Sequence, residues 1–188
     1  MRGAVVAALL MAASQSQSVA QSIINTVAGS GRILTGVGGP AIDVPLGNPR
    51  GVAVDSHGNV YAADTMQGVV FKISPNGNAT VFAGNGSRGF SGDGGPATAA
   101  AFLYPWALAI DAQDNVYISD YHNSRVRMVD AGGIITTVAG GGISYYGTDN
   151  VSALSSAVFE PAGLAVDAAG NLYIAESGSC AVQKVTPD

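Results

Sequence analysis

The chain has 188 residues, of which 47% are apolar, only 11% are charged and 26 are glycines. This length suits one domain with a substantial core, and the composition is that of a β-rich, turn-rich protein rather than a disordered chain. The formal net charge is −5 and Lys and Arg form no cluster, which argues against a nucleic-acid partner.

The first 20 residues are typical of a secretory signal peptide. Arg2 gives a short positive region, residues 3–13 form an apolar run, and Ser18-Val19-Ala20 offers a small-x-small cleavage site. The apolar run is too short to cross a bilayer. We therefore expect a mature chain that begins at Gln21, is secreted or periplasmic, and has no membrane span after cleavage.

Residues 21–188 repeat themselves with a period of 56. The segments PRGVAVDSHGNVYAAD, PWALAIDAQDNVYISD and PAGLAVDAAGNLYIAE begin at Pro49, Pro105 and Pro161. A second set, TVAG at 26–29, VFAG at 81–84 and TVAG at 137–140, keeps this spacing within one residue. Chance does not place so many matched residues at one offset, so the pattern indicates three copies of one supersecondary unit.

Each repeat is predicted to hold four strands joined by hairpins. In the first repeat they are expected at 51–55, 60–64, 69–73 and 79–83, which are rich in β-branched residues. The turns between them contain Gly and Asn, which tolerate the left-handed backbone of a tight hairpin. Four hairpin-linked strands describe one propeller blade, and only 97–102 could form even a turn or two of helix.

The segments GVAVDSHGNVYAAD, NSRVRMVD and GFSGDGGPAT resemble the NHL-repeat β-propellers, especially the secreted bacterial type with a Gly-Asp-Gly-Gly-Pro-Ala loop. The resemblance covers the mature chain. It implies an all-β propeller segment of three four-stranded blades, half of a six-bladed ring, with the first strand of each blade lining the central channel. The loops after the second strands depart from the family pattern, because only Asn123 and Arg125 remain of its usual Asn-His-Arg.

The segment Gly84-Asn85-Gly86-Ser87-Arg88-Gly89 also matches the G-x-G-x-x-G pattern of dinucleotide-binding proteins. That function requires a helix that opens at the last glycine, but FSGDGGPATAAAF follows and its Gly and Pro residues oppose one. Segments at the same place in the other repeats also lie between a fourth strand and the next first strand. We therefore interpret the glycines as part of a connection between blades and expect no cofactor.

Loop positions that differ between repeats are the candidate ligand-binding site. The loops between second and third strands share one end of the propeller with the long inter-blade connections; we call this end the connection face, and the end with the short turns the hairpin face. Long, divergent loops on a rigid scaffold commonly carry function. The candidates are Arg50, Arg88, Phe90, Trp106, Tyr121, His122, Arg125, Tyr145 and Tyr146.

Arginine and aromatic side chains together suit contact with a protein, a peptide or a glycan. Trp106 is the best single candidate, because indole side chains dominate contact energies and no other repeat has one. For any one of these residues the alternative is an ordinary loop anchor.

Two sets of carboxylates recur once per repeat. Asp55, Asp111 and Asp167 end the first strands, and Asp64, Asp120 and Glu176 end the second strands. They could form rings that bind a cation around the channel, or each could accept hydrogen bonds from the backbone of its adjoining turn. A role needed in every blade favours the turns.

The sequence offers no catalytic or metal-binding constellation. His57 and His122 are expected on opposite faces, and neither zinc-ligand spacing nor G-x-S-x-G occurs. The single cysteine, Cys180, excludes an intramolecular disulfide. We therefore predict a secreted, non-enzymatic binding module. The alternative is a propeller enzyme of the lyase or lactonase type with a channel metal, as some related propellers are.

Three blades do not make a closed propeller, which needs about four to eight. A sheet edge and apolar blade faces are therefore expected to be open. The segment 23–29 is predicted to be a fourth strand without its own blade, and 181–185 a third strand without a fourth. Closure could come from further blades in a longer chain, which we favour because the sequence stops inside a turn, or from head-to-tail pairing of two copies.

Overall fold

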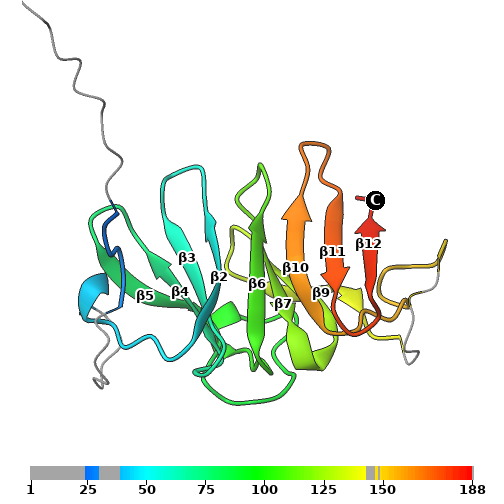
Figure 1. Cartoon of the computed structure of the whole chain (residues 1–188), viewed down its shortest axis with the longest axis horizontal. Helices are drawn as coiled ribbons and strands as arrows, with labels where there is room; N and C mark the ends of the chain where they lie inside the picture. Colours follow the sequence, from blue (N-terminus) through cyan, green and yellow to red (C-terminus); the bar gives the residue numbers. More distant parts are fainter. Residues whose placement is uncertain (1–23, 30–38, 143–146, 148, 188) are drawn as a thin grey trace, which may run out of the picture.

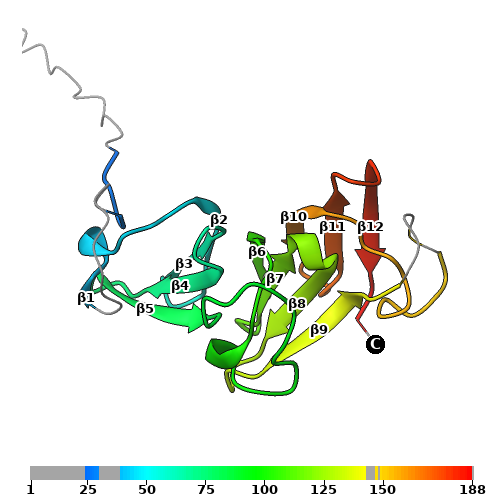
Figure 2. The ribbon, with the colours of Figure 1, turned by 90° about the horizontal axis from the view of Figure 1, so that it is seen from below.

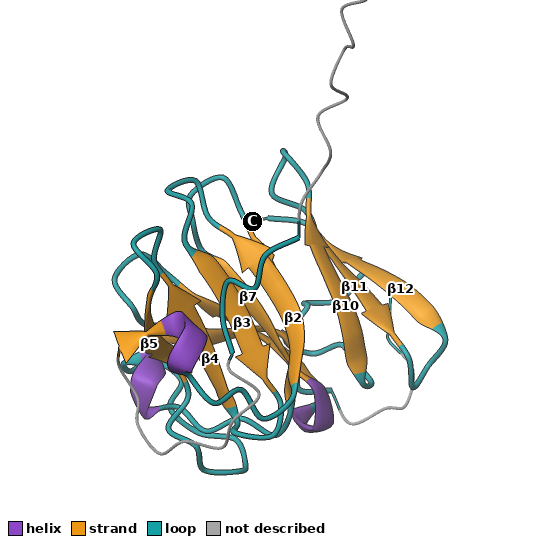
Figure 3. Ribbon diagram, turned by 60° about the vertical axis from the view of Figure 1, so that its left-hand side comes forward, coloured by secondary structure: helices purple, strands orange, loops and turns teal. Residues whose placement is uncertain are grey.

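The computed structural model describes residues 24–29, 39–142, 147 and 149–187, which form strands with only short helical turns (Figure 3). Three antiparallel sheets stand side by side as blades, with the second between the first and third (Figures 1 and 2). The described chain is thus an all-β segment of three propeller blades that do not close on themselves. None of its helices has the length and apolar character that a membrane crossing requires.

The blades follow the chain in order. Blade 1 consists of β2 (Pro49–Val54), β3 (Val60–Asp64), β4 (Val69–Ile73) and β5 (Asn78–Ala83), with the two-residue β1 (Gly39–Pro40) added beyond β5. Blade 2 consists of β6 (Pro105–Ile110), β7 (Val116–Asp120), β8 (Arg125–Val129) and β9 (Ile135–Gly140). Blade 3 consists of β10 (Pro161–Val166), β11 (Leu172–Glu176) and β12 (Ala181–Val185).

The predicted strands of the first repeat are confirmed, with three ends displaced by one or two residues. β3 and β4 coincide with the prediction, and the helical turn expected within 97–102 is the short η2 (Ala97–Ala99). The first strands β2, β6 and β10 are neighbours at the inner edges of the blades, as the family pattern implies (Figure 1).

The strand predicted over 23–29 is wrong for its described part. Residues 24–29 form no strand, and Ile24 is 99% exposed. A strand needs a neighbour that shares its backbone hydrogen bonds. In the described residues this segment is held instead by a bond from the N–H of Gly29 to the carbonyl of Ala41, at 2.9 Å.

One hydrogen-bond pattern builds the first hairpin of every blade. In blade 1, one oxygen of Asp55 accepts the backbone N–H groups of His57 at 3.0 Å and Asn59 at 2.8 Å. The other oxygen accepts the Asn59 side chain at 2.7 Å and the Tyr61 hydroxyl at 3.1 Å. Asp111 and Asp167 make the same four contacts one and two periods later. The first carboxylate set therefore holds the turns together.

Successive blades pack face to face through apolar side chains. The cluster between blades 1 and 2 includes Tyr61, Ala63, Val70, Leu108, Val116 and Ile118. The cluster between blades 2 and 3 includes Tyr117, Val126, Leu164, Leu172 and Ile174. Tyr61 and Tyr117, which occupy the same position in successive repeats, thus pack between blades.

The outer faces of blades 1 and 3 have no blade against them in the described residues. Val182 of β12 is 72% exposed, whereas its counterpart in blade 2, Val126, is fully buried. On the opposite side, Val52 of β2 is 66% exposed, whereas its counterpart Leu108 is 7% exposed. The two open faces are the same two that meet at each interface inside the chain.

The described segments that lead into blades 1 and 2 each dock on the outer part of the blade that they enter. Pro40 pairs with Asn78 at the start of β5, and one period later Pro96 forms a bridge with Ile134 just before β9. Arg127 of β8 is fully buried and holds the second connection through an ion pair with Asp93, at 2.6 Å. These contacts fix the loops that form the connection face.

Candidate functional site

The inter-blade connections, and with them the connection face, lie at the bottom of Figure 1. A row of aromatic and arginine side chains crosses this face. The arginine–aromatic row consists of Arg50, Trp106, Tyr121, His122, Tyr104 and Arg88. The guanidinium carbon of Arg50 lies 4.4 Å from the centroid of the Trp106 ring, which stacks on the Tyr121 ring at 4.8 Å and 24°. Trp106 is half-buried by these contacts.

The other half of the row continues from Tyr121 without a break. The Tyr121 and His122 rings meet edge to face at 4.9 Å, and His122 meets the Tyr104 ring in the same way at 4.9 Å. The guanidinium carbon of Arg88 lies 5.1 Å from the Tyr104 centroid and one of its N–H groups donates to the Tyr104 hydroxyl at 3.0 Å. The row therefore ends in a guanidinium group at both ends.

A backbone contact common to all blades brings the row together. The residue before the first-strand proline accepts a hydrogen bond from the N–H of the residue that begins the loop after the second strand. In blade 2 this bond joins Tyr121 to the Tyr104 carbonyl at 3.2 Å, and His122 donates to the Leu103 carbonyl at 3.1 Å. The equivalent pairs are Thr65 with Asn48 and Ser177 with Glu160. Only blade 2 has aromatic residues at both positions, so only there does the scaffold contact create an aromatic surface.

The row also reaches the third blade. The Tyr121 hydroxyl, on the short helix η3 (Tyr121–Asn123), donates to the Glu160 carboxylate at 3.0 Å and lies 3.0 Å from the Ser177 hydroxyl. Arg50 belongs to blade 1 and Trp106 to blade 2, so this one chain of contacts joins all three blades.

Phe90 and Arg125 form a second cluster on this face. The Arg125 guanidinium carbon lies 4.1 Å from the centroid of the Phe90 ring, which is 43% exposed. The side chain of Asn123 donates to the Gly89 carbonyl and to Asp120, both at 2.8 Å, and so ties this connection to η3. The predicted Tyr145 and Tyr146 lie outside the described residues.

The sequence analysis missed Tyr104, although a signal was present. Its counterparts one period away are Asn48 and Glu160, so the position differs in every repeat. Tyr104 directly precedes the proline that begins the first strand in every repeat, and its backbone is left-handed, with φ of 62°. Comparison of the residues before these prolines, as well as those after them, would have identified it.

Much of the chain matches known proteins in sequence and in fold. A family model of the Teneurin NHL domain matches residues 71–146. Human Teneurin-1 is 31% identical over 163 residues, which are 80% of this chain but 6% of that protein. A Bacteroides thetaiotaomicron protein of unknown function is 27% identical, with a TM-score of 0.57, over 68% of this chain and 32% of that one. The chain belongs to the NHL-repeat family.

The fold is also shared at lower sequence identity. An auxiliary nutrient binding protein from Bacteroides ovatus superposes with a TM-score of 0.63 at 20% identity, over 79% of this chain and 39% of that one. This NHL-repeat chain thus spans well under half the length of the solved structures and a small part of the curated relatives that it matches.

The second carboxylate set of the NHL blades holds loops in place. Asp64 is fully buried and accepts backbone N–H groups of the incoming connection, at Gly47 and Asn48, and of the following loop, at Met66 and Gln67. Asp120 and Glu176 likewise bind the backbone of the incoming connection, at Leu103 and Phe159. In the described residues no group of three or more His, Cys, Asp or Glu side chains is placed to hold a metal ion.

Burial dominates the electrostatics of Asp120. It raises the pKa of this carboxyl to about 6, against the hydrogen bonds from Asn123 and Leu103 and the charge of Arg127, which lower it. The group faces the protein interior rather than solvent, since its exposed fraction is zero. We assign it to the docking of the connection and not to ligand contact.

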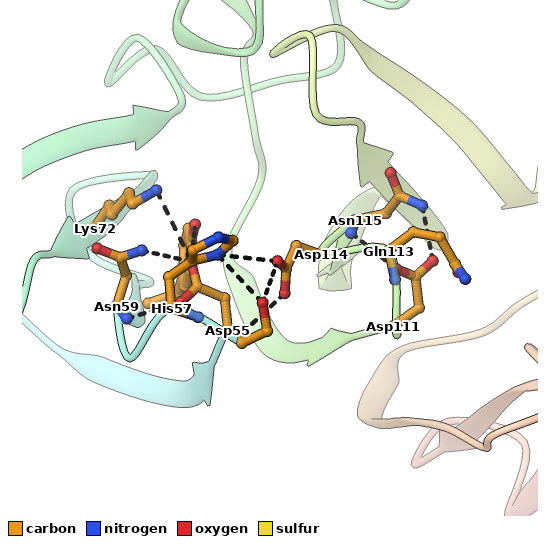
Figure 4. Close-up of polar contacts among 10 residues, drawn as sticks. Asp55, His57, Asn59, Lys72, Asp111, Gln113, Asp114 and Asn115 are labelled. Atoms are coloured by element: carbon orange, nitrogen blue, oxygen red, sulfur yellow. Dashed lines mark hydrogen bonds and ion pairs between the residues drawn. The ribbon is translucent and has the colours of Figure 1, made fainter.

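A serine, a histidine and an aspartate meet on the hairpin face between blades 1 and 2 (Figure 4). The Ser56 hydroxyl donates to Asp114 at 2.7 Å, and the same Asp114 oxygen lies 3.1 Å from Nδ1 of His57. A nucleophilic triad needs the carboxylate and the serine on different ring nitrogens, but Ser56 also approaches Nδ1, at 3.2 Å. The cluster therefore joins two blades and does not activate a nucleophile.

Proposed function

We propose that this NHL-repeat chain is a secreted, non-enzymatic binding module whose connection face holds a protein, peptide or glycan ligand. The arginine–aromatic row is the observation that carries this proposal. The row brings five of the predicted residues into one surface. Arg50 comes from blade 1, Arg88 from the connection, and Trp106, Tyr121 and His122 from blade 2.

The physical character of the row supports a binding role. Aromatic and arginine side chains supply large contact areas and are the residue types that dominate binding energies at interfaces. Their mutual contacts hold them in place before a ligand arrives, which reduces the entropy lost on binding. His122 and Arg88 are exposed, so part of the row is open to solvent.

The competing function is a channel-metal enzyme of the lyase or lactonase type. Such an enzyme would bind a metal ion in stoichiometric amount and turn over its substrate. Metal analysis of the purified protein, with assays on lactone and uronate-polysaccharide substrates, separates the two functions. A tightly bound stoichiometric metal together with turnover would overturn the binding-module proposal.

The proposal is tested with the secreted product of the full chain on an array of neutral and acidic polysaccharides and peptides. The two histidines provide a matched pair of variants, because both are exposed and they lie on opposite faces. We expect His122→Ala to weaken binding of the captured probe by about fivefold or more, while His57→Ala leaves it unchanged. Equal effects of the two variants would contradict a site on the connection face.

A further inference from the structure

The exposed arginines and the carboxylates of the hairpin turns lie at opposite ends of the described molecule. Arg50, Arg88 and Arg125 are the arginines with exposed surface in the described residues, and all three lie on the connection face. The turns of the hairpin face carry carboxylates instead, at Asp55, Asp111, Asp114, Asp130 and Asp167. The connection face therefore gathers the exposed guanidinium groups of a chain whose formal net charge is −5, and the half-buried Glu160, which accepts the Tyr121 hydroxyl, is a carboxylate beside them.

The three surface arginines are held by aromatic rings and not by carboxylates. Their guanidinium carbons lie 4.4, 5.1 and 4.1 Å from the rings of Trp106, Tyr104 and Phe90 respectively. None of the three forms an ion pair with a carboxylate of the described residues, whereas the buried Arg127 is paired with Asp93. The positive charge of the face is thus not neutralised by ion pairs within the described chain.

A guanidinium that lies on an aromatic ring is prepared to bind an anion. Arginine has five N–H donors in its plane, and stacking restricts its orientation without using them. Arg88 donates one of them to Tyr104 and Arg125 donates one to the Asn123 carbonyl. The remaining donors match the two oxygens of a carboxylate, which arginine binds in a bidentate way.

We propose that the connection face binds an acidic polysaccharide, with carboxylate groups on Arg50 and Arg88 and sugar rings along the aromatic side chains between them. This inference rests on the proposed binding function and adds the chemical class of the ligand. A polymer of uronic acids carries sugar rings and carboxylates, so it can place rings along the aromatic side chains and carboxylates on the arginines at the two ends of the row. An acidic peptide shares the charge but not the rings, so it is the alternative outcome.

The test compares charged and neutral forms of one polymer. The secreted full chain is titrated with polygalacturonate, alginate and hyaluronan, and with the methyl esters of each, in low salt and in 0.5 M salt. We expect at least one acidic polymer to bind, its ester to bind about tenfold or more weakly, and added salt to weaken the acidic form because it screens exposed charges.

Charge-removing variants locate the contact. Arg50→Gln and Arg88→Gln should each weaken binding of the acidic polymer by about tenfold, which corresponds to about 1.4 kcal/mol. Lys184→Gln is the matched control, because Lys184 is an exposed cation on β12 outside the row, and it should leave affinity unchanged. Circular dichroism of each variant shows that lost binding is not lost folding.

The outcomes separate this inference from the proposed function. If esters and acids bind equally, or if only an acidic peptide of the array binds, the acidic-polysaccharide assignment is wrong and the binding module stands. If no acidic polymer binds but another arrayed probe does so through His122, the same conclusion holds. If no probe of the array binds, both proposals fail.

Discussion

The guanidinium carbon of Arg50 lies 4.4 Å from the ring centroid of Trp106, so the first strand of blade 1 touches that of blade 2 at the connection face. Tyr121 stacks on the same indole and binds Glu160 of the third blade through its hydroxyl. Trp106 therefore joins blades as well as lying in the candidate site. From sequence alone, we expect its removal to affect only ligand binding, and these contacts change that expectation.

We expect Trp106→Ala to abolish ligand binding and also to lower the free energy of unfolding by about 1–3 kcal/mol. The cation–π and stacked pairs contribute about 0.5–1.5 kcal/mol each beyond the area they bury. Trp106→Phe keeps a ring between Arg50 and Tyr121 and should recover most of the stability. Thermal and urea unfolding measure both variants, and an unchanged melting temperature for Trp106→Ala would show that the stack does not join the blades.

The scaffold could be predicted from sequence because every blade repeats it locally. The offset of 56 placed the strands, and the repeated aspartate, asparagine and tyrosine of each first hairpin interact within seven residues of one another. Local contacts of this kind need no knowledge of the rest of the chain. The role of Asp55, Asp111 and Asp167 in their turns follows from the same reasoning and is confirmed.

The sequence predicted most members of the row but not how they contact one another, because those contacts join segments that are distant in the sequence. Tyr104 meets His122 since the loop of η3 is bound to the backbone before β6, and this bond joins residues 17 positions apart. The two-residue β1 was missed for a similar reason, because only its pairing with β5, between residues 38 and 40 positions apart, makes it a strand. Periodicity carries no information on such pairs.

The repeated hairpins predict a graded loss of stability. Asp55 and Asp167 make the same four hydrogen bonds, but Asp55 is 8% exposed and Asp167 lies on the exposed end of blade 3. Removing a buried acceptor leaves donors unsatisfied at a cost of about 1–3 kcal/mol, whereas water replaces an exposed one. Asp55→Ala should therefore destabilise the protein clearly more than Asp167→Ala in urea unfolding. Equal losses would show that burial does not set the strength of this network.

The ionisation of Asp120 should make stability depend on pH. Burial raises its pKa from the ordinary 3.8 to about 6, so between these values the folded protein holds a proton that the unfolded chain releases. The stability from the protonated form is therefore fully present below pH 3.8 and is lost as the pH rises through about 6.

We expect the unfolding free energy of the wild type, relative to Asp120→Asn, to fall by on the order of 1–3 kcal/mol from pH 4 to pH 7. The comparison with Asp120→Asn removes the contributions of the other carboxylates, because they are the same in both proteins. Asp55, Asp114 and Asp167 have lowered pKa values, so the stability that they contribute is lost as the pH falls below 3.8. A difference that stays constant over this range would show that Asp120 titrates at its ordinary value.

The open face of blade 3 gives a test with its own internal control. Val126 and Val182 occupy the same position in successive blades, but Val126 is fully buried against blade 3 while Val182 is 72% exposed. Val126→Ala leaves a cavity between blades and should cost about 1–3 kcal/mol. Val182→Ala removes a side chain that already contacts water and should stay within about 0.5 kcal/mol of the wild type. Urea unfolding, with light scattering to give the mass, measures both. If Val182→Ala costs as much as Val126→Ala, the open face is covered in solution by a further blade, and a mass twice that of the chain would identify that blade as part of a second copy.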